Sequence, residues 1–193
     1  MFDREVHEES RGLDLGSVLP HVKAATAGPH RQQQRISDLT PVSRAFVGSL
    51  MTTYVIDIGA GLRFVSEQDL TGTAITVDEL HQRAVRNFAE LVAKQRVRMP
   101  KYHAITPVLY DGNFEVSLMF LDEVWAWFEA QFGEPAILAV APARDIFAFC
   151  PASSAEGRTQ LGELIDRVWP TADHPLTRDF YRRVDGAWQL DQP

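Results

Sequence analysis

Short apolar segments that occur in adjacent pairs, separated by tight turns, constrain the fold of this chain more than any other feature. Four such pairs follow one another: 50–58 with 62–65, 103–110 with 114–120, 136–141 with 146–150, and 180–184 with 187–190. The first pair alternates apolar and polar residues with the period of two that a strand requires, and Gly59 and Gly61 lie in its turn. Asp-Gly turns join the second and fourth pairs and favour two-residue hairpin loops. We therefore expect four hairpins.

Three amphipathic segments separate the hairpins. The clearest one begins at Thr76, which with Glu79 forms the N-cap and N3 positions of a capping box, and it extends to about Lys94. The other two are 122–132, which ends at Gly133, and 154–168, which ends before Pro170. Since the strands come in adjacent pairs rather than singly between helices, the pattern predicts an α+β domain. Its sheet is expected to be mostly antiparallel or mixed, with about three helices packed on it.

The domain is expected to occupy residues 41–193, after a polar lead-in at 1–40. Within the lead-in the pattern allows a short helix over 15–25, with Pro20 in its first turn. The segment 27–38, which contains Gly28, Pro29 and three consecutive glutamines, is typical of a linker. A chain of 193 residues with 45% hydrophobic content can bury a continuous core without metal or disulfide support.

Charge and cysteine content exclude several classes of protein. The chain has 19 basic and 26 acidic residues, a net charge of −7, which argues against generic attraction to nucleic acid or anionic lipid. Its only cysteine, Cys150, excludes an intramolecular disulfide and predicts a reducing compartment, which we take to be the cytoplasm. No apolar segment approaches the roughly 20 residues that span a bilayer, and the first sixteen residues lack the apolar core of a signal peptide.

Motifs that carry familiar chemistry are missing from the sequence. No two of the six histidines are spaced by three or four residues on a predicted helix, no glycine-rich phosphate loop precedes a helix, and no GxSxG motif is present. We therefore expect no metal and no cofactor. Cys150 is predicted to be a small buried hydrophobe, and His81 a partly buried histidine bonded to a carbonyl group rather than a general base.

Polar residues on otherwise apolar strands are the best candidates for a site. Alternation along 114–120 places Glu115 and Ser117 on the face opposite the apolar residues. If the strands are neighbours, Asp57, at the end of the first strand, and Arg144 and Asp145, at a hairpin corner, converge on the same surface. Such a cluster can orient a ligand or polarise a water molecule. The structural alternative, which we favour, pairs Arg144 with Glu115 or Asp57 and uses Asp145 to cap the turn.

Several segments of the chain also resemble a known family. They are GSLMTTYVID (48–57), LRFVSEQDL (62–70), ELHQRAVRNF (79–88), FEVSLMFLD (114–122), AVAPARDIF (139–147) and the tail from DHPL at 173 through Trp188. In this order they resemble the YtpQ-like family of bacterial domains of unknown function. Val116 and Met119 depart from the Ala and Leu of the family pattern. The resemblance singles out the same polar set and adds Asn87, but it implies no activity.

Two functions remain open at this stage, and the first is a non-enzymatic module that presents an acidic surface to a protein partner. Residues 101–150 contain seven acidic and two basic side chains, whereas residues 1–100 are balanced at twelve of each. The alternative is a small hydrolase or ligand-processing enzyme with Glu115 or Asp145 as the general base and Arg144 as the anion anchor. Either function is compatible with a homodimer that uses Trp127 or Trp188 in its interface.

Overall fold

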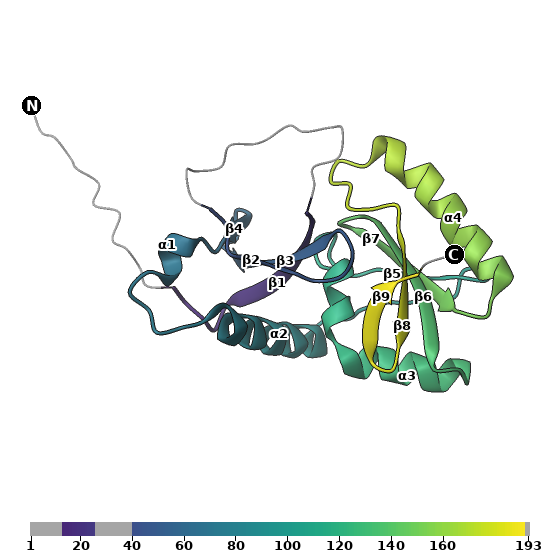
Figure 1. Cartoon of the computed structure of the whole chain (residues 1–193), viewed down its shortest axis with the longest axis horizontal. Coiled ribbons are helices and arrows are strands. Elements are labelled where there is room, and N and C mark those ends of the chain that lie inside the picture. Colours follow the sequence, from purple (N-terminus) through teal and green to yellow (C-terminus); the bar gives the residue numbers. More distant parts are fainter. Residues whose placement is uncertain (1–12, 26–39, 192–193) are drawn as a thin grey trace, which may run out of the picture.

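The computed structural model describes residues 13–25 and 40–191, and it confirms the α+β prediction. Two antiparallel sheets lie next to each other, with helices α2, α3 and α4 packed around them (Figure 1). One large cluster of buried side chains joins the sheets, because it contains Leu19 and Leu50 from the first and Phe147, Phe149 and Tyr181 from the second. The two sheets therefore share a core.

The first sheet has the order β1-β3-β2 and is built around β3 (Leu50–Asp57), which also pairs with β4 (Leu62–Phe64) in the hairpin predicted from the glycine turn. Strand β1 (Val18–Ala24) pairs with one side of β3 and β2 (Ser43–Ala45) with the other. After the short helix α1 (Glu67–Leu70), helix α2 (Val77–Lys94) packs on β1. Both hydrogen bonds of the predicted capping box are present at its start.

The expected helix over 15–25 is wrong, because these residues contain strand β1. Every β1 residue pairs with β3, from Val18 opposite Ile56 to Ala24 opposite Leu50. Among the described residues β1 has a strand on one side only, so Pro20 can lie in it without breaking the ladder. The predicted linker at 27–38 lies outside the described residues.

The second sheet has the order β5-β7-β6-β8-β9. The predicted hairpins are present as β6 (Ala136–Ala143) with β7 (Ile146–Pro151), and β8 (Phe180–Val184) with β9 (Ala187–Leu190). Asp185 and Gly186 both have positive φ, 50° and 78°, the backbone that a type I′ hairpin turn needs. Helix α4 (Ala155–Val168) covers β6 and β7 and continues into the 3₁₀ turn η2 (Trp169–Thr171), while α3 (Asp122–Phe132) lies at the opposite end of the sheet in Figure 1.

The hairpin expected from 103–110 and 114–120 is the second wrong prediction. Strand β5 (Thr106–Val108) pairs with β7 instead, and the second half of the expected hairpin is the 3₁₀ helix η1 (Val116–Phe120). Its alternating apolar residues do not face one side only: Val116, Ser117, Leu118 and Met119 are all buried, between β1 and α3. The 3₁₀ turn is held from α3, where the Trp125 indole N–H donates to the Leu118 carbonyl at 2.7 Å.

Candidate functional site

The structure does not bring the predicted polar residues together on one surface. Glu115 is 3% exposed, and its Oε1 accepts hydrogen bonds from the backbone N–H groups of Tyr110 at 3.1 Å and Gly112 at 2.8 Å. Burial raises the pKa of the Glu115 carboxyl, although the amide hydrogen bonds oppose the shift. Its second oxygen has no hydrogen-bond partner in the described chain. Glu115 therefore holds the loop before η1 rather than pairing with Arg144.

Among the described residues, Asp57 and Ser117 have a local partner or none, whereas Asn87 has distant backbone partners. Asp57 is exposed and accepts the Gly59 backbone N–H at 2.7 Å, which closes the turn after β3. Ser117 is buried, with no partner for its hydroxyl group in the described chain. Asn87, on α2, donates from Nδ2 to the carbonyl groups of Leu15 at 2.8 Å and Val18 at 3.0 Å, so it ties α2 to the start of β1.

Arg144 and Asp145 are at the corner between β6 and β7, as expected, but their surroundings differ from the prediction. The Arg144 side chain is half-buried and its Nε has no partner among the described residues. Asp145 is exposed. The nearest connection runs through the backbone, where the Arg144 N–H donates to the His174 carbonyl at 3.1 Å. The Arg144 backbone thus contacts the segment before β8. The pKa of the His174 imidazole is lowered by burial and then by the positive charge of Arg144, which is close to it.

Cys150 is buried as the sequence predicts, and His81 is partly buried as predicted but has a different partner. Cys150 is fully buried, and burial raises the pKa of its thiol to about 11, so it is no thiolate nucleophile at neutral pH. His81 is half-buried, but its Nδ1 lies 3.3 Å from the Tyr54 hydroxyl group rather than near a carbonyl. Burial lowers the pKa of His81 and raises that of Tyr54 to about 12, so both groups are neutral at pH 7.

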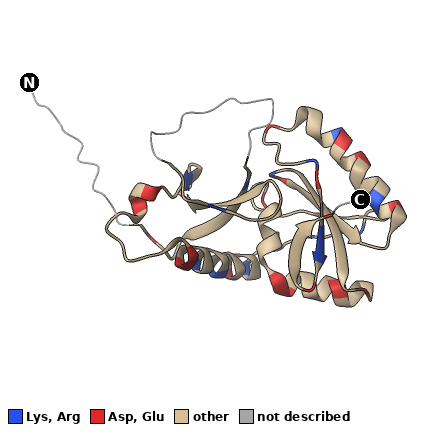
Figure 2. Ribbon diagram, viewed as in Figure 1, with Lys and Arg blue, Asp and Glu red and all other residues tan. Residues whose placement is uncertain are grey.

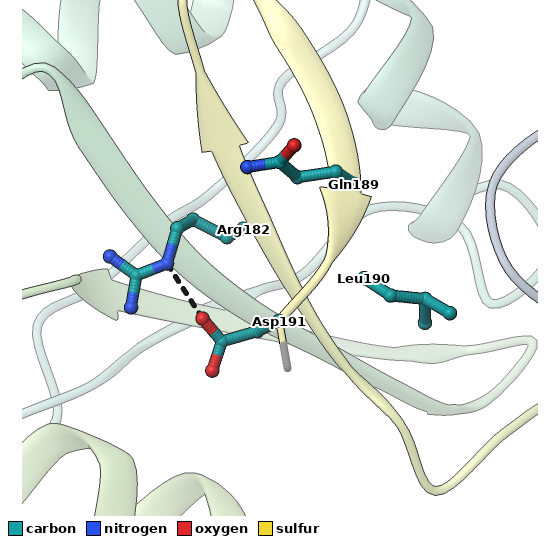
Figure 3. A pocket seen from close by; sticks show the side chains of 4 residues that line it. All are labelled: Arg182, Gln189, Leu190 and Asp191. Atoms are coloured by element: carbon teal, nitrogen blue, oxygen red, sulfur yellow. Dashed lines mark hydrogen bonds and ion pairs between the residues drawn. The ribbon is translucent and has the colours of Figure 1, made fainter. Parts of the chain in front are cut away.

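A polar pocket of about 590 Å³ lies beside the last strand and is lined by Arg182, Gln189, Leu190 and Asp191 (Figure 3). Asp191 accepts hydrogen bonds from Arg182 Nε and from Arg158 Nη2, both at 2.6 Å. Burial alone would raise the pKa of Asp191, but the two arginines lower it on balance. Asp191 is shared by the two arginines, so these three side chains keep a net charge of +1, and their ion pairs join α4, β8 and the residue after β9.

An apolar groove of about 470 Å³ separates the end of α2 from α3. Its lining residues come from α2, the segment after it, η1 and α3: Val92, Val97, Met99, Leu118, Val124, Trp127 and Phe128. The side chain that distinguishes the groove is Trp127, which is 57% exposed, whereas Trp125 on the same helix is fully buried. Trp188, the other tryptophan predicted for an interface, instead contacts the Trp125 ring and donates to the Met119 carbonyl.

Charged residues are close in sequence to the lining residues of the groove. Three exposed basic residues, Lys94, Arg96 and Arg98, lie between or beside lining residues in the sequence, but none of them lines the groove itself. The α3 bank begins with Asp122 and Glu123, which are exposed in the first turn of that helix. Figure 2 shows acidic segments of the ribbon along α3, below the second sheet. Glu123 is exposed one turn before Trp127, so the two lie on the same face of α3. Trp127 was the only sequence signal for this groove, because the rest of its lining comes from separate elements.

No protein-family model matches this chain, and no curated protein or solved structure is significantly similar to it. The YtpQ-like resemblance therefore stays a prediction. Within residues 13–25 and 40–191 no three histidine, cysteine, aspartate or glutamate side chains are grouped in a way that could hold a metal ion. Over the same residues no helix has both the length and the apolar character needed to cross a bilayer.

Proposed function

We propose that this protein is a non-enzymatic binding module that docks a helix of a partner protein in the groove beside Trp127. The observation that carries the proposal is a large aromatic side chain, 57% exposed, at an apolar groove. Exposed tryptophans of this kind are enriched among the residues that contribute most to binding energy at interfaces. A helix fits because an apolar ridge of side chains at positions i, i+3, i+4 and i+7 can fill a groove formed between two helices.

The acidic start of α3 specifies the partner further. The α3 bank, with Asp122 and Glu123, favours basic side chains on one edge of the partner helix. This refines the acidic surface expected from composition: Asp122 and Glu129 are also within 3.2 and 3.3 Å of Arg183, which offsets part of their charge. A second copy of this chain is a weaker occupant, because two molecules of net charge −7 repel each other.

The proposal includes a cytoplasmic location and excludes nucleic acid as the partner. The thiol of Cys150 is the only one in the chain, which fits a reducing compartment. The net negative charge disfavours contact with phosphate backbones. No hydrolase is proposed, because Glu115 and Arg144 contact different parts of the fold.

The experiment is affinity capture from lysate with the full chain, followed by cross-linking and peptide identification. We expect a protein whose cross-linked peptide is an amphipathic helix, bound by the wild type and weakened about 30-fold or more by Trp127→Ala, the loss typical of a dominant interface residue. Glu123→Lys should also weaken it. Tyr102→Ala is the matched control, since Tyr102 is 59% exposed but lies outside the groove lining.

Two results would overturn the proposal. The first is capture in which Trp127→Ala and Tyr102→Ala retain the same proteins in the same amounts. The second is a homodimer, measured by light scattering, that Trp127→Ala converts to a monomer. That result would mean that a second copy of the chain occupies the groove.

A further inference from the structure

His21 is a buried histidine that the proposed function does not use. It lies on β1 opposite Thr53 and is 1% exposed. Its ring has edge-on contacts with Phe64 and Phe114, at centroid distances of 6.1 and 5.7 Å. Both ring nitrogens are buried and have no hydrogen-bond partner among the described residues. Such a group costs free energy unless something pairs with it, so a buried imidazole with two unpaired nitrogens indicates a ligand.

The charged groups that face His21 come from both sheets and are mostly cationic. Lys23, two residues further along β1, places its Nζ over the Phe64 ring at 5.3 Å from the centroid. Arg144 comes from the β6–β7 corner, and His174 is held beside that corner by its carbonyl contact with the Arg144 N–H at 3.1 Å. Burial first, and then the positive charges of Lys23, Arg144 and His174, lower the pKa of His21 to about 3. Of the acidic groups, Asp173 and Asp145 act on His174.

These four side chains, His21, Lys23, Arg144 and His174, form what we call the cationic cluster. Burial increases from its rim to its floor: His174 is exposed, Lys23 and Arg144 are half-buried, and His21 is buried. Neither Lys23 nor Arg144 forms an ion pair with a carboxylate in the part of the chain that the structure describes, and the Arg144 Nε is buried without a partner. Half-buried cations without counter-ions are destabilising, and a bound anion would remove that cost.

We propose that the cationic cluster binds the phosphate group of a small molecule, with the buried His21 beneath it and with Lys23 and Arg144 as its charged partners. A phosphate dianion matches the positive charges of Lys23 and Arg144, whereas a carboxylate neutralises only one of them. The guanidinium of Arg144 can donate two parallel hydrogen bonds to phosphate oxygens, and Lys23 supplies a point charge. The imidazole of His21 supplies an N–H donor in either protonation state. This site is independent of the groove beside Trp127.

Isothermal titration of the full chain with inorganic phosphate, at constant ionic strength, tests the site. We expect one phosphate per chain, with acetate bound at least tenfold more weakly and chloride weaker still. Glycerol phosphate should bind as well, because the cluster recognises the phosphate group, and the tighter of the two identifies an ester or the free ion as the ligand. The His21 ring resonances, followed by NMR, should shift on saturation with phosphate.

Variants separate the site from general charge attraction. Arg144→Gln and Lys23→Gln should each weaken phosphate binding tenfold or more. Arg178→Gln should change it less than twofold, because Arg178 carries the same charge but is exposed and paired with Asp166 at 2.7 Å. Thermal unfolding of each variant checks that it is folded. If Arg144→Gln does not fold, Lys23→Gln alone provides the test. Equal losses in Lys23→Gln and Arg178→Gln, or equal binding of phosphate and chloride, would refute the site.

Discussion

Substitution of Glu115 distinguishes a carboxylate that holds a loop from one that acts as a base. If Glu115 holds the loop, its contribution to stability comes from two hydrogen bonds, which the amides of Tyr110 and Gly112 donate to a single oxygen, Oε1. A glutamine at this position keeps an acceptor oxygen where Oε1 lies. An alanine removes the acceptor and leaves a cavity at a position that is 3% exposed.

The magnitudes follow from burial. A buried amide that loses its hydrogen-bond acceptor costs about 1–3 kcal/mol. Of the two amides, only that of Gly112 can bind water instead, because Gly112 is exposed. With the lost packing, Glu115→Ala should reduce the free energy of unfolding by about 2–4 kcal/mol. Glu115→Gln should change it by less than about 1 kcal/mol at pH 7, because the unpaired amide nitrogen and the removed buried charge have opposing effects.

The pH dependence gives a second, independent readout. The pKa of Glu115 is raised above its ordinary value of 4.5, mainly by burial, so the folded state favours the protonated carboxyl. Its stabilising contribution is therefore complete below that ordinary value and is lost as the pH rises through the raised pKa. Relative to Glu115→Gln, the wild type should lose stability over this interval and then reach a plateau.

Denaturant unfolding followed by circular dichroism, between pH 4 and pH 8, measures both effects. The reasoning fails if Glu115→Gln is as unstable as Glu115→Ala at pH 7. That result would mean that the loop is held by the ionised carboxylate and not by an acceptor oxygen alone. If the wild type instead becomes more stable relative to Glu115→Gln as the pH rises, the pKa of Glu115 is not raised.

Four further substitutions test the packing of the second sheet, each by denaturant unfolding. Gly157→Ala should destabilise by about 1–3 kcal/mol, because its Cβ would lie 2.7 Å from the buried Cys150 sulfur, whereas Gly162→Ala on the same helix should stabilise by about 0.5–1 kcal/mol; similar effects of the two would contradict the close packing of α4. Trp125→Phe should cost about 2–4 kcal/mol through its lost carbonyl hydrogen bond and the cavity it leaves, and a cost below about 1 kcal/mol would argue against that bond. Asp191→Asn should cost about 2 kcal/mol at pH 7, and since the pKa of Asp191 is lowered, the difference should vanish as the pH falls through that lowered value; a difference that persists there would contradict the arginine pairing.

The candidate sites could be predicted only in part. Trp127 was identifiable because it lies off the apolar stripe of its helix, and α3 leaves it exposed as that pattern implies. The other lining residues of the groove, on α2 and η1, could not be identified, because no local sequence pattern predicts which elements pack together. Glu115 and Arg144 were identified as polar residues in apolar surroundings, but not their partners: Glu115 binds amides three and five residues before it, in a loop where a hairpin was expected, and Arg144 contacts the distant His174. His21 was missed because nothing beside it in the sequence indicates burial without a hydrogen-bond partner.

What the sequence by itself determined is the local structure: the capping box and apolar stripe of α2, the Gly133 end of α3, and the Asp185-Gly186 turn between β8 and β9. These depend on interactions within a few residues, which are the same in any fold. Only the tertiary structure decided that residues 18–24 are a strand and residues 116–120 a 3₁₀ helix. The first depends on pairing with β3, about thirty residues away, and the second on burial between β1 and α3. Both outcomes are set by long-range contacts that override local spacing.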